Sequence, residues 1–353
     1  MTEGAPIRRE PPSDLSQMVT VVKYELLKHT RSRRLIGSIA VIVLIISLIY
    51  AIPLALNNPY AGHTTLQVEV IPYGPVSYAF LNNSHALNDT MVIHVNGTLL
   101  PRSNSTWIFN EDGTNRVLFM SNLSGQKVVA DFDFKTPAKD FSDTFMNFMN
   151  MLVIILVTFF GADALVSEYQ NRTAYLLFPN PIRREVMFAG KFIASFIACL
   201  TMIGWFYLLI LVLSLISIGG VATYLGLSFC FAILYLLACL AVAYFVSSIL
   251  KGSTGAIILT FFLLLMILPI VQSVGMISGM KMWFLLTFMG TLPSTALSWD
   301  NYPIDSVQTI PGMGFTLYNY YPDPGTSVIV MFAYVAIFVA MSIFLFRRKE
   351  LTG

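Results

Sequence analysis

Long apolar stretches alternate with short charged segments along most of this chain. A helix that crosses a membrane needs about 20 mostly apolar residues, because the hydrocarbon core of a bilayer is about 30 Å thick. Six stretches have this length and composition: residues 35–56, 145–166, 192–218, 223–250, 255–279 and 327–346. The pattern therefore predicts an α-helical polytopic membrane protein with six transmembrane helices.

The composition agrees with this prediction. Hydrophobic residues make up 56% of the chain and charged residues 11%, whereas charged residues are about 25% of an ordinary soluble domain. The four histidines are scattered along the sequence and match no zinc-binding motif. These numbers argue against an ordinary soluble protein, and the histidine pattern argues against a zinc site.

The basic residues indicate how the predicted spans are oriented. They gather in residues 8–34, before the first span, in residues 172–191, between the second and third, and in residues 347–349, after the sixth. Cytosolic segments of membrane proteins are enriched in Lys and Arg. We therefore expect both termini, residues 1–34 and 347–353, in the cytosol, and residues 57–144 outside the cell, in a multi-pass protein of the plasma membrane.

Residues 57–144 have the composition of a soluble domain. Short runs of alternating apolar and polar residues occur at 65–70, 91–95, 116–120 and 128–134, with turn signals such as Asn96–Gly97 between them. Alternation with a period of two is typical of strands in antiparallel sheets. The segment is predicted to be an inserted extracellular β-sandwich-like domain.

Five Asn-x-Ser/Thr sequences fall in this segment, at Asn82, Asn88, Asn96, Asn104 and Asn122. Such sequences accept N-linked glycans. A sixth, at Asn171, lies on the predicted cytosolic side, where glycan transfer does not occur. Five in so short a segment indicate a glycoprotein, and an archaeal or eukaryotic source is expected.

The N-terminal segment 1–34 contains an amphipathic pattern. Leu15, Met18, Val19, Val22 and Leu26 recur at helical spacing and share one face of a helix. A helix of this kind is expected to lie on the inner membrane surface before the first span.

The segment 280–326, between the fifth and sixth spans, is expected on the outer side. Its first part, residues 280–298, is apolar but is interrupted by Gly290 and Pro293. We interpret it as a re-entrant segment or an outer-surface helix, with Trp283 and Trp299 at the level of the lipid headgroups.

Two absences narrow the range of functions. The predicted spans contain one ionisable residue, Asp163, near the inner end of the second span; proton- or sodium-driven carriers use such residues near the midplane, so a secondary carrier is disfavoured. A GxxxxGK[ST] phosphate-binding loop is also missing, because Gly190–Lys191 is followed by Phe192. The chain is therefore predicted not to be an enzyme and to have no ATPase site of its own.

An ordered set of residues marks the charged segment after the second span: Asp163, Glu168, Thr173, Leu176–Leu177, Pro181–Arg184 and Gly190–Lys191. Residues 24–28 near the start and 346–351 near the end add to this set. Together with the six spans, it resembles the membrane permease subunits of type-2 ABC exporters, the ABC-2 permeases. Arg172 stands where that family usually has glycine, and Pro179 is an additional proline.

The resemblance implies that residues 167–191 form a cytosolic coupling loop that binds a separately encoded ATPase. It also implies a dimer of two permease subunits, identical or different, with ATP and Mg²⁺ bound by the ATPase and no cofactor, metal or nucleic acid bound by this chain. The expected coupling residues are Glu168, Tyr169, Arg172, Thr173, Tyr175, Leu176, Leu177, Phe178, Pro181, Arg183 and Arg184. Asp163 and Glu168 could pair with Arg172 or Lys191, or could be charges at the level of the headgroups.

Two functions remain open at this point. The first is the permease subunit of an ATP-driven exporter, whose charge-poor spans favour an apolar or amphipathic substrate such as a lipid, peptide or drug. The alternative is a membrane-anchored glycoprotein without transport activity, whose external domain binds a ligand or mediates adhesion. The charged segment at 167–191 favours the first.

Overall fold

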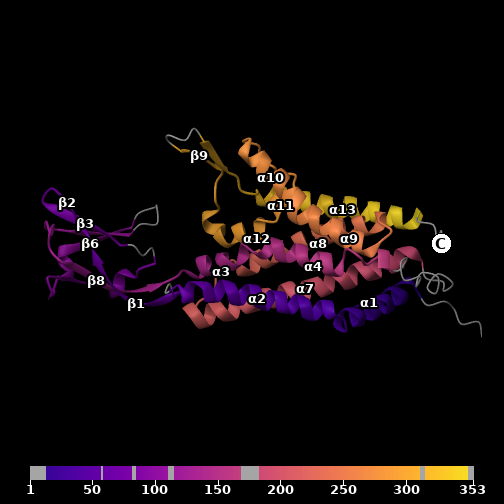
Figure 1. Cartoon of the computed structure of the whole chain (residues 1–353), viewed down its shortest axis with the longest axis horizontal. Helices are drawn as coiled ribbons and strands as arrows, with labels where there is room; N and C mark the ends of the chain where they lie inside the picture. The colour runs from indigo at the N-terminus through magenta and orange to yellow at the C-terminus, as the bar shows by residue number, and fades with distance from the viewer. Residues whose placement is uncertain are drawn as a thin grey trace, which may run out of the picture. The chain divides into compact units, whose positions relative to one another are not determined.

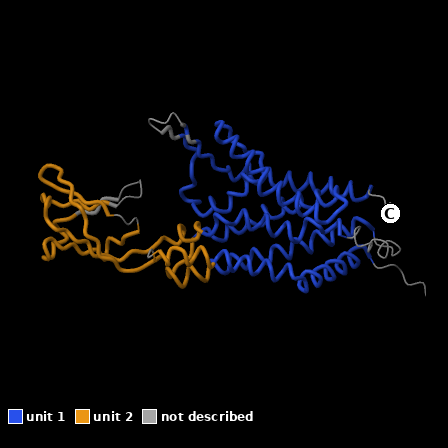
Figure 2. The backbone as a smooth tube through the Cα atoms, viewed as in Figure 1, with its two compact units in different colours: residues 1–46, 145–210, 223–353 blue, residues 47–144, 211–222 orange. Residues whose placement is uncertain are grey.

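The computed structural model of the chain describes residues 13–56, 59–81, 85–109, 115–167, 183–310 and 315–348. They form two compact units (Figure 2). The first, here called the helical unit, comprises residues 1–46, 145–210 and 223–353, and the second, the β unit, comprises residues 47–144 and 211–222. Several helices contribute residues to both.

Six helical segments of the described chain are long and apolar enough to cross a membrane, which confirms the predicted number. They are α2 (Arg33–Ala55), α3 with α4 (Ala138–Met146 and Met149–Phe160), α7 (Arg184–Ile218), α8 (Leu225–Ile249), the helix over Ser253–Ile277, and α13 (Pro324–Arg348). An additional helix, α1 (Asp14–Thr30), precedes α2. The chain is therefore a multi-pass membrane protein.

Two of the predicted spans differ in extent from the helices. The second, predicted at 145–166, corresponds to helices that begin at Ala138 and end at Phe160. The third, predicted at 192–218, begins at Arg184, so that the last part of the expected 167–191 loop is the first two turns of α7. Apolar content shows where a helix can lie in lipid. It does not show where contacts with polar side chains from other parts of the fold make that helix shorter or longer.

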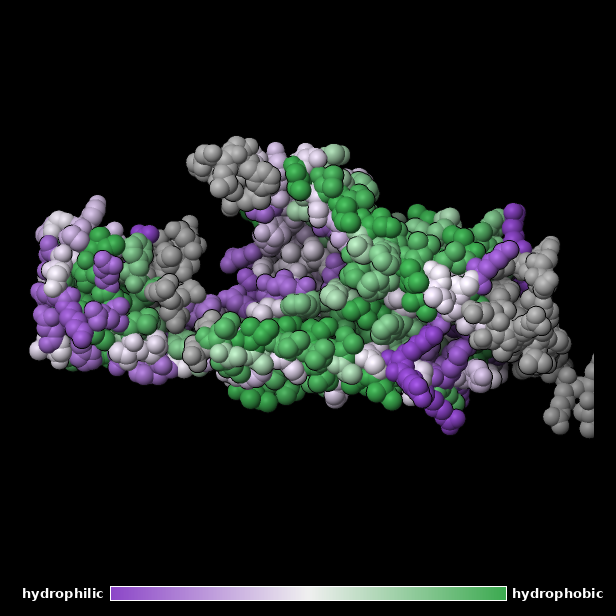
Figure 3. Space-filling model, in the orientation of Figure 1, coloured by the Kyte–Doolittle hydropathy of each residue, from purple (hydrophilic) through white to green (hydrophobic). Residues whose placement is uncertain are grey.

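Helix α8 lies at the centre of the helical unit. It packs against α4, α9 (Ser253–Phe262) and α13, and these helices run side by side in Figure 1. Small buried residues line it, including Ala238, Ala241 and Ala243, which allows close approach of neighbouring helices. By contrast, α2, α10 (Leu268–Ile277) and α13 expose many large apolar side chains, and hydrophobic residues dominate the face of this unit in Figure 3. A lipid environment suits that surface.

The fifth span contains a local change of helix type. Helix α9 continues through a π-helical turn, η3 (Leu263–Ile267), into α10 (Leu268–Ile277). Pro269 lies in the first turn of α10 and has no backbone N–H to donate to the preceding turn. The π turn accommodates the missing hydrogen bond.

The segment after α10 folds into the helical unit. It contains two short helices, α11 (Leu286–Met289) and α12 (Leu292–Thr295), the 3₁₀ helix η4 (Ala296–Asn301), and a hairpin of β9 (Ser306–Ile310) and β10 (Phe315–Asn319). Both α11 and α12 pack against α8, and their apolar side chains are buried. Both short helices thus belong to the packed interior of the helical unit.

The β unit contains the predicted sandwich. One antiparallel sheet has the order β1-β8-β4-β5 and the other β2-β3-β7-β6. The strands are β1 (Ala61–Val68), β2 (Val70–Tyr73), β3 (Val76–Leu81), β4 (Val92–Val95), β5 (Thr98–Leu99), β6 (Ser105–Phe109), β7 (Asn115–Phe119) and β8 (Val128–Lys135). Strands β1, β4, β7 and β8 contain most of the residues of the four alternating runs, and the predicted turn has positive φ at both Asn96 and Gly97.

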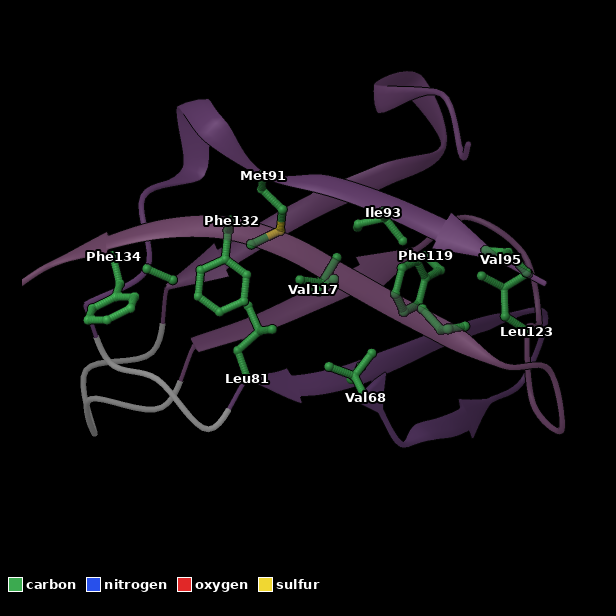
Figure 4. Packing of buried hydrophobic residues seen from close by; sticks show 14 residues of the cluster. Val68, Leu81, Met91, Ile93, Val95, Val117, Phe119, Leu123, Phe132 and Phe134 are labelled. Atoms are coloured by element: carbon green, nitrogen blue, oxygen red, sulfur yellow. The ribbon is translucent and has the colours of Figure 1, made fainter. Parts of the chain in front are cut away.

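Alternate residues of the strands form one core between the two sheets (Figure 4). In β8, Val128, Ala130, Phe132 and Phe134 are buried, while the residues between them are more exposed. Val117 and Phe119 of β7 face them from the other sheet. Full burial of each such side chain contributes about 1.5–3 kcal/mol of hydrophobic free energy, so this core is what stabilises the β unit.

Candidate functional site

Most of the predicted coupling residues lie outside the described residues. They are Glu168, Tyr169, Arg172, Thr173, Tyr175, Leu176, Leu177, Phe178 and Pro181. Arg183 and Arg184 are described, and they lie at the beginning of α7. The structure therefore describes the start of α7, which follows this segment, and the elements that contact it.

Two arginines connect the start of α7 to α1 and α13. Arg183 Nη1 lies 3.1 Å from Asp14 Oδ2 in the first turn of α1. Arg184 Nη1 donates to the carbonyl oxygen of Arg347 at 2.9 Å, and Arg347 pairs with Glu185. The last carbonyls of a helix have no partner within it, so Arg184 satisfies one of these groups in α13.

A buried ion pair joins α7 to α1 two turns further along. Lys191 Nζ lies 2.5 Å from Glu25 Oε1, and the two side chains are only 3% and 7% exposed. The other oxygen of Glu25 lies 3.5 Å from Lys28 Nζ. Breaking a buried pair of this kind leaves an uncompensated charge in a low-dielectric environment. The contact therefore fixes α1 against α7 at one position.

Gly190 explains how the two helices come so close. A Cβ atom at this position would lie 2.7 Å from Cγ1 of Val21 and 3.4 Å from the carbonyl oxygen of Met18. Any larger residue would push α1 away and lengthen the Lys191–Glu25 contact. The Gly190–Lys191 pair of the sequence pattern thus has two roles, one in close approach and one in the ion pair. We call Arg183, Arg184, Gly190 and Lys191, with their partners on α1 and α13, the α7 junction.

The face of α1 that packs at the junction differs from its apolar stripe. Gln17 and Glu25 are buried, whereas Leu15 and Val19 of the stripe are exposed. The stripe is thus free to contact lipid. Sequence reasoning missed Glu25 because an acid on an amphipathic helix is usually assigned to its solvent side. Glu25 belongs to the 24–28 segment of the family resemblance, and its spacing from Val21 places both residues on one face of the helix, but neither signal indicates a partner on α7.

Asp163 has a different partner from those expected. Arg34 of α2 donates to both of its carboxylate oxygens, at 2.8 and 2.6 Å, and Ser253 Oγ donates to it at 3.3 Å. The described partners of Asp163 are thus Arg34 and Ser253, whereas Lys191 pairs with Glu25; Glu168 and Arg172 lie outside the described residues. A bidentate arginine–carboxylate pair has defined geometry, so it fixes the start of α2 beside the end of α4.

Side chains from three other helices satisfy the backbone where α4 ends. Arg34 donates to the carbonyl of Phe159 at 3.0 Å, and Ser195 Oγ donates to that of Phe160 at 2.8 Å. Ser247 Oγ accepts from the N–H groups of Leu165 and Val166. Non-helical backbone at membrane depth is tolerated only where it finds such partners. These bonds explain why α4 ends at Phe160 although the apolar sequence continues.

A second polar network holds the broken segment between α10 and α13. Tyr235 of α8 donates to Asn150 of α4, and a Cβ atom on Gly290 would lie 2.7 Å from Cζ of Tyr235. Ser228 Oγ donates to the carbonyl of Pro293 at 2.6 Å. The Ser228–Pro293 bond therefore holds α12 against α8, and the Tyr235–Asn150 bond fixes the ring against which Gly290 packs.

Four of the five predicted glycan acceptors are described: Asn88, Asn96, Asn104 and Asn122; Asn82 lies outside the described residues. The side-chain oxygen of Asn96 accepts from Lys127 N at 3.0 Å, and its amide nitrogen donates to Gln126 at 3.4 Å. Asn122 accepts from Ser124 N and makes a local turn. Within the described ranges, no group of three or more His, Cys, Asp or Glu side chains is placed to hold a metal ion.

The comparison with known families gives one match. The family model described as "ABC-2 family transporter protein" matches residues 19–351. The matched range begins within α1, runs past the end of α13 and includes every residue of the α7 junction except Asp14 and Met18. No curated protein matches the chain.

Proposed function

This chain belongs to the ABC-2 family of transporter proteins and is a membrane permease, and we propose that it works as one half of an ATP-driven exporter. Two such subunits form the pathway, and each binds a separately encoded ATPase. The ATPase binds ATP and Mg²⁺ and hydrolyses the nucleotide. The apolar spans favour an apolar or amphipathic cargo, which is a lipid, a peptide or a drug-like molecule.

The α7 junction is the observation that supports this proposal most strongly. The segment 168–182 connects the end of α4 to the start of α7, and buried or bidentate ion pairs hold both of these ends. A partner that moves this segment would therefore move α1, α2 and α7 as well. Coupling needs such a rigid connection, because the ATPase can shift the permease from one conformation to another only if its contacts with the two conformations differ.

The proposal includes a topology. The ends of the chain and the segment 168–182 lie in the cytosol, and the sandwich lies outside the cell with N-linked glycans. Asn122 is a better acceptor than Asn96, because its nitrogen is not used in a described bond, whereas the amide of Asn96 bonds through both of its atoms.

Purification of the chain from its native membrane in mild detergent tests the proposal. A nucleotide-binding subunit should co-purify in a one-to-one ratio with the permease, and ATP hydrolysis should be absent from the permease alone. A complex without any nucleotide-binding subunit would argue against the exporter.

A cavity in the β unit supports the second candidate function, ligand binding by the sandwich. The cavity has a volume of about 680 Å³, and both apolar residues such as Met91 and Val117 and charged residues such as Asp89 and Arg102 line it. This volume suits a small amphipathic ligand. A protein with this role alone would bind its ligand fully without any ATPase partner.

A further inference from the structure

We propose that residues 268–283, the second half of the fifth span and the turn after it, form a hinged strap that opens and closes a cavity in the helical unit. The cavity has a volume of about 410 Å³. Its lining combines two residues of the strap with one of α11 and two at the start of α13: Lys281, Trp283, Met289, Asp323 and Thr326. A movement of the strap therefore changes access to this cavity.

The π turn η3 is the hinge at one end of the strap. Its hydrogen bonds run from residue i to residue i+5, and such turns interrupt α-helices mostly at functional sites. Pro269 follows it and has no N–H to donate to the preceding turn. Bends in helices concentrate at prolines and at π turns. The fifth span is therefore most easily bent between residues 263 and 269.

The two halves of the fifth span are held to different degrees. Helix α9 packs against α4 and α8 and buries Ala256 and Thr260. Helix α10 packs mainly against α11 and β10, and of its ten described residues only Gly275 is buried. It lies at the edge of the helical unit in Figure 1. Segments with few buried contacts open at the lowest free energy, so α10 is the half that moves.

Two contacts with the chain around the β9–β10 hairpin hold the strap closed. The hydroxyl of Tyr320 donates to the carbonyl of Gly279 at 2.7 Å, and Lys281 Nζ lies 2.7 Å from Asp305 Oδ2. We call these two contacts the strap latch. The side chains of the ion pair are 32% and 39% exposed, so water can replace this contact at little cost when the strap opens.

Beyond the strap the chain is fixed again. The hydroxyl of Tyr334, on α13, donates to the carbonyl of Phe284 at 3.1 Å. Helix α11 then packs against α8 and α13. Its residue Met289 is only 1% exposed although it lines the cavity. The strap is thus a movable piece between two fixed ends, and its opening uncovers Met289 while α11 stays folded. This inference does not depend on the exporter function proposed above.

Cysteine labelling of the full-length chain in detergent tests the proposal. Cys199 and Cys239 are buried and Cys230 is exposed, so Cys230→Ser is made in every variant. Met289→Cys should react slowly with a water-soluble maleimide. Adding Tyr320→Phe should make this reaction about tenfold faster, because the loss of one ordinary hydrogen bond shifts an opening equilibrium by up to about that factor. The labelling rate follows the population of the open form when opening is fast.

Three further variants separate the hinge from the latch. Pro269→Ala restores an N–H that can donate within the helix, so it should slow the labelling of the Tyr320→Phe variant. Tyr321 contacts Asp305 through its backbone N–H, so Tyr321→Phe is the matched control and should leave the rate unchanged. Leu292→Cys, at a fully buried residue of α12, should stay unreactive with or without Tyr320→Phe.

Each contrary result overturns one part of the proposal. Equal labelling of Met289→Cys with and without Tyr320→Phe would overturn the latch. Fast labelling that persists after Pro269→Ala would overturn the hinge. An equal gain in the labelling of Leu292→Cys would mean that the whole segment unfolds, and it would overturn the strap itself, as would fast labelling in the Tyr321→Phe control.

Discussion

Replacement of Lys191 by methionine should destabilise the helical unit strongly. The change leaves Glu25 buried without the cation that lies 2.5 Å away. Removal of one partner of a buried ion pair costs about 3–5 kcal/mol. Lys28 lies 3.5 Å from the same carboxylate but is half exposed, so it offsets part of this cost, and we expect a value at the lower end of that range.

A double variant separates charge from packing. Glu25→Leu together with Lys191→Met replaces the pair by apolar side chains of similar volume, a change that is often neutral or stabilising. The double variant should therefore recover most of the stability that the single variant loses. Arg183→Gln provides a control, because its pair with Asp14 is exposed, with side chains 73% and 54% accessible, and such pairs contribute under about 1 kcal/mol.

Thermal unfolding in detergent, followed by size-exclusion chromatography, measures these differences. The expected order of stability is wild type and Arg183→Gln first, then the double variant, then Lys191→Met clearly below them. Equal unfolding temperatures for Lys191→Met and Arg183→Gln would refute the reasoning, because they would mean that the Lys191–Glu25 pair is not buried in the protein.

Three further predictions follow from other contacts. Gly190→Ala should cost about 1–3 kcal/mol through overpacking against Val21, and Val21→Ala should restore stability in the same unfolding assay. Tyr235→Phe should cost about 1–3 kcal/mol, because Asn150 loses its partner, and protease should then cut the 280–301 segment faster. The hydrogen bond to Asp133 and the charge of Asp131 raise the pKa of His63. The stabilisation from this histidine is therefore present below its ordinary pKa of 6.5 and is lost as the pH rises through the raised value. Hydrogen exchange of the backbone amides of β1 and β8, corrected for the intrinsic pH dependence of exchange, should therefore increase across that range. His63→Gln should abolish this change.

The sequence predicts the six spans and the sandwich because both depend on local patterns. Twenty apolar residues in a row, or alternation with a period of two, identify an element without knowledge of its neighbours. The Gly190–Lys191 pair was also recognisable, but its role was not, since its partners Val21 and Glu25 lie far away in the sequence. A contact over that separation leaves no local signal.

The end of α4 likewise depends on contacts with residues that lie far away in the sequence. Its apolar sequence continues to Val166, yet the helix ends at Phe160. Arg34, Ser195 and Ser247 bond the freed backbone groups, and each comes from another helix. Hydropathy cannot detect these donors, so it predicted the existence of the span correctly and its extent less well.

The central claim is that the segment 168–182 binds an ATPase, and a pull-down of the nucleotide-binding subunit tests it most directly. Leu177→Asp with Phe178→Asp should abolish binding, because two unpaired carboxylates in an interface cost several kcal/mol. Ile304→Asp, at a residue that is 84% exposed, is the matched control and should bind the ATPase as the wild-type chain does. Undiminished binding by the double variant, in a chain that still inserts and folds, would contradict the account.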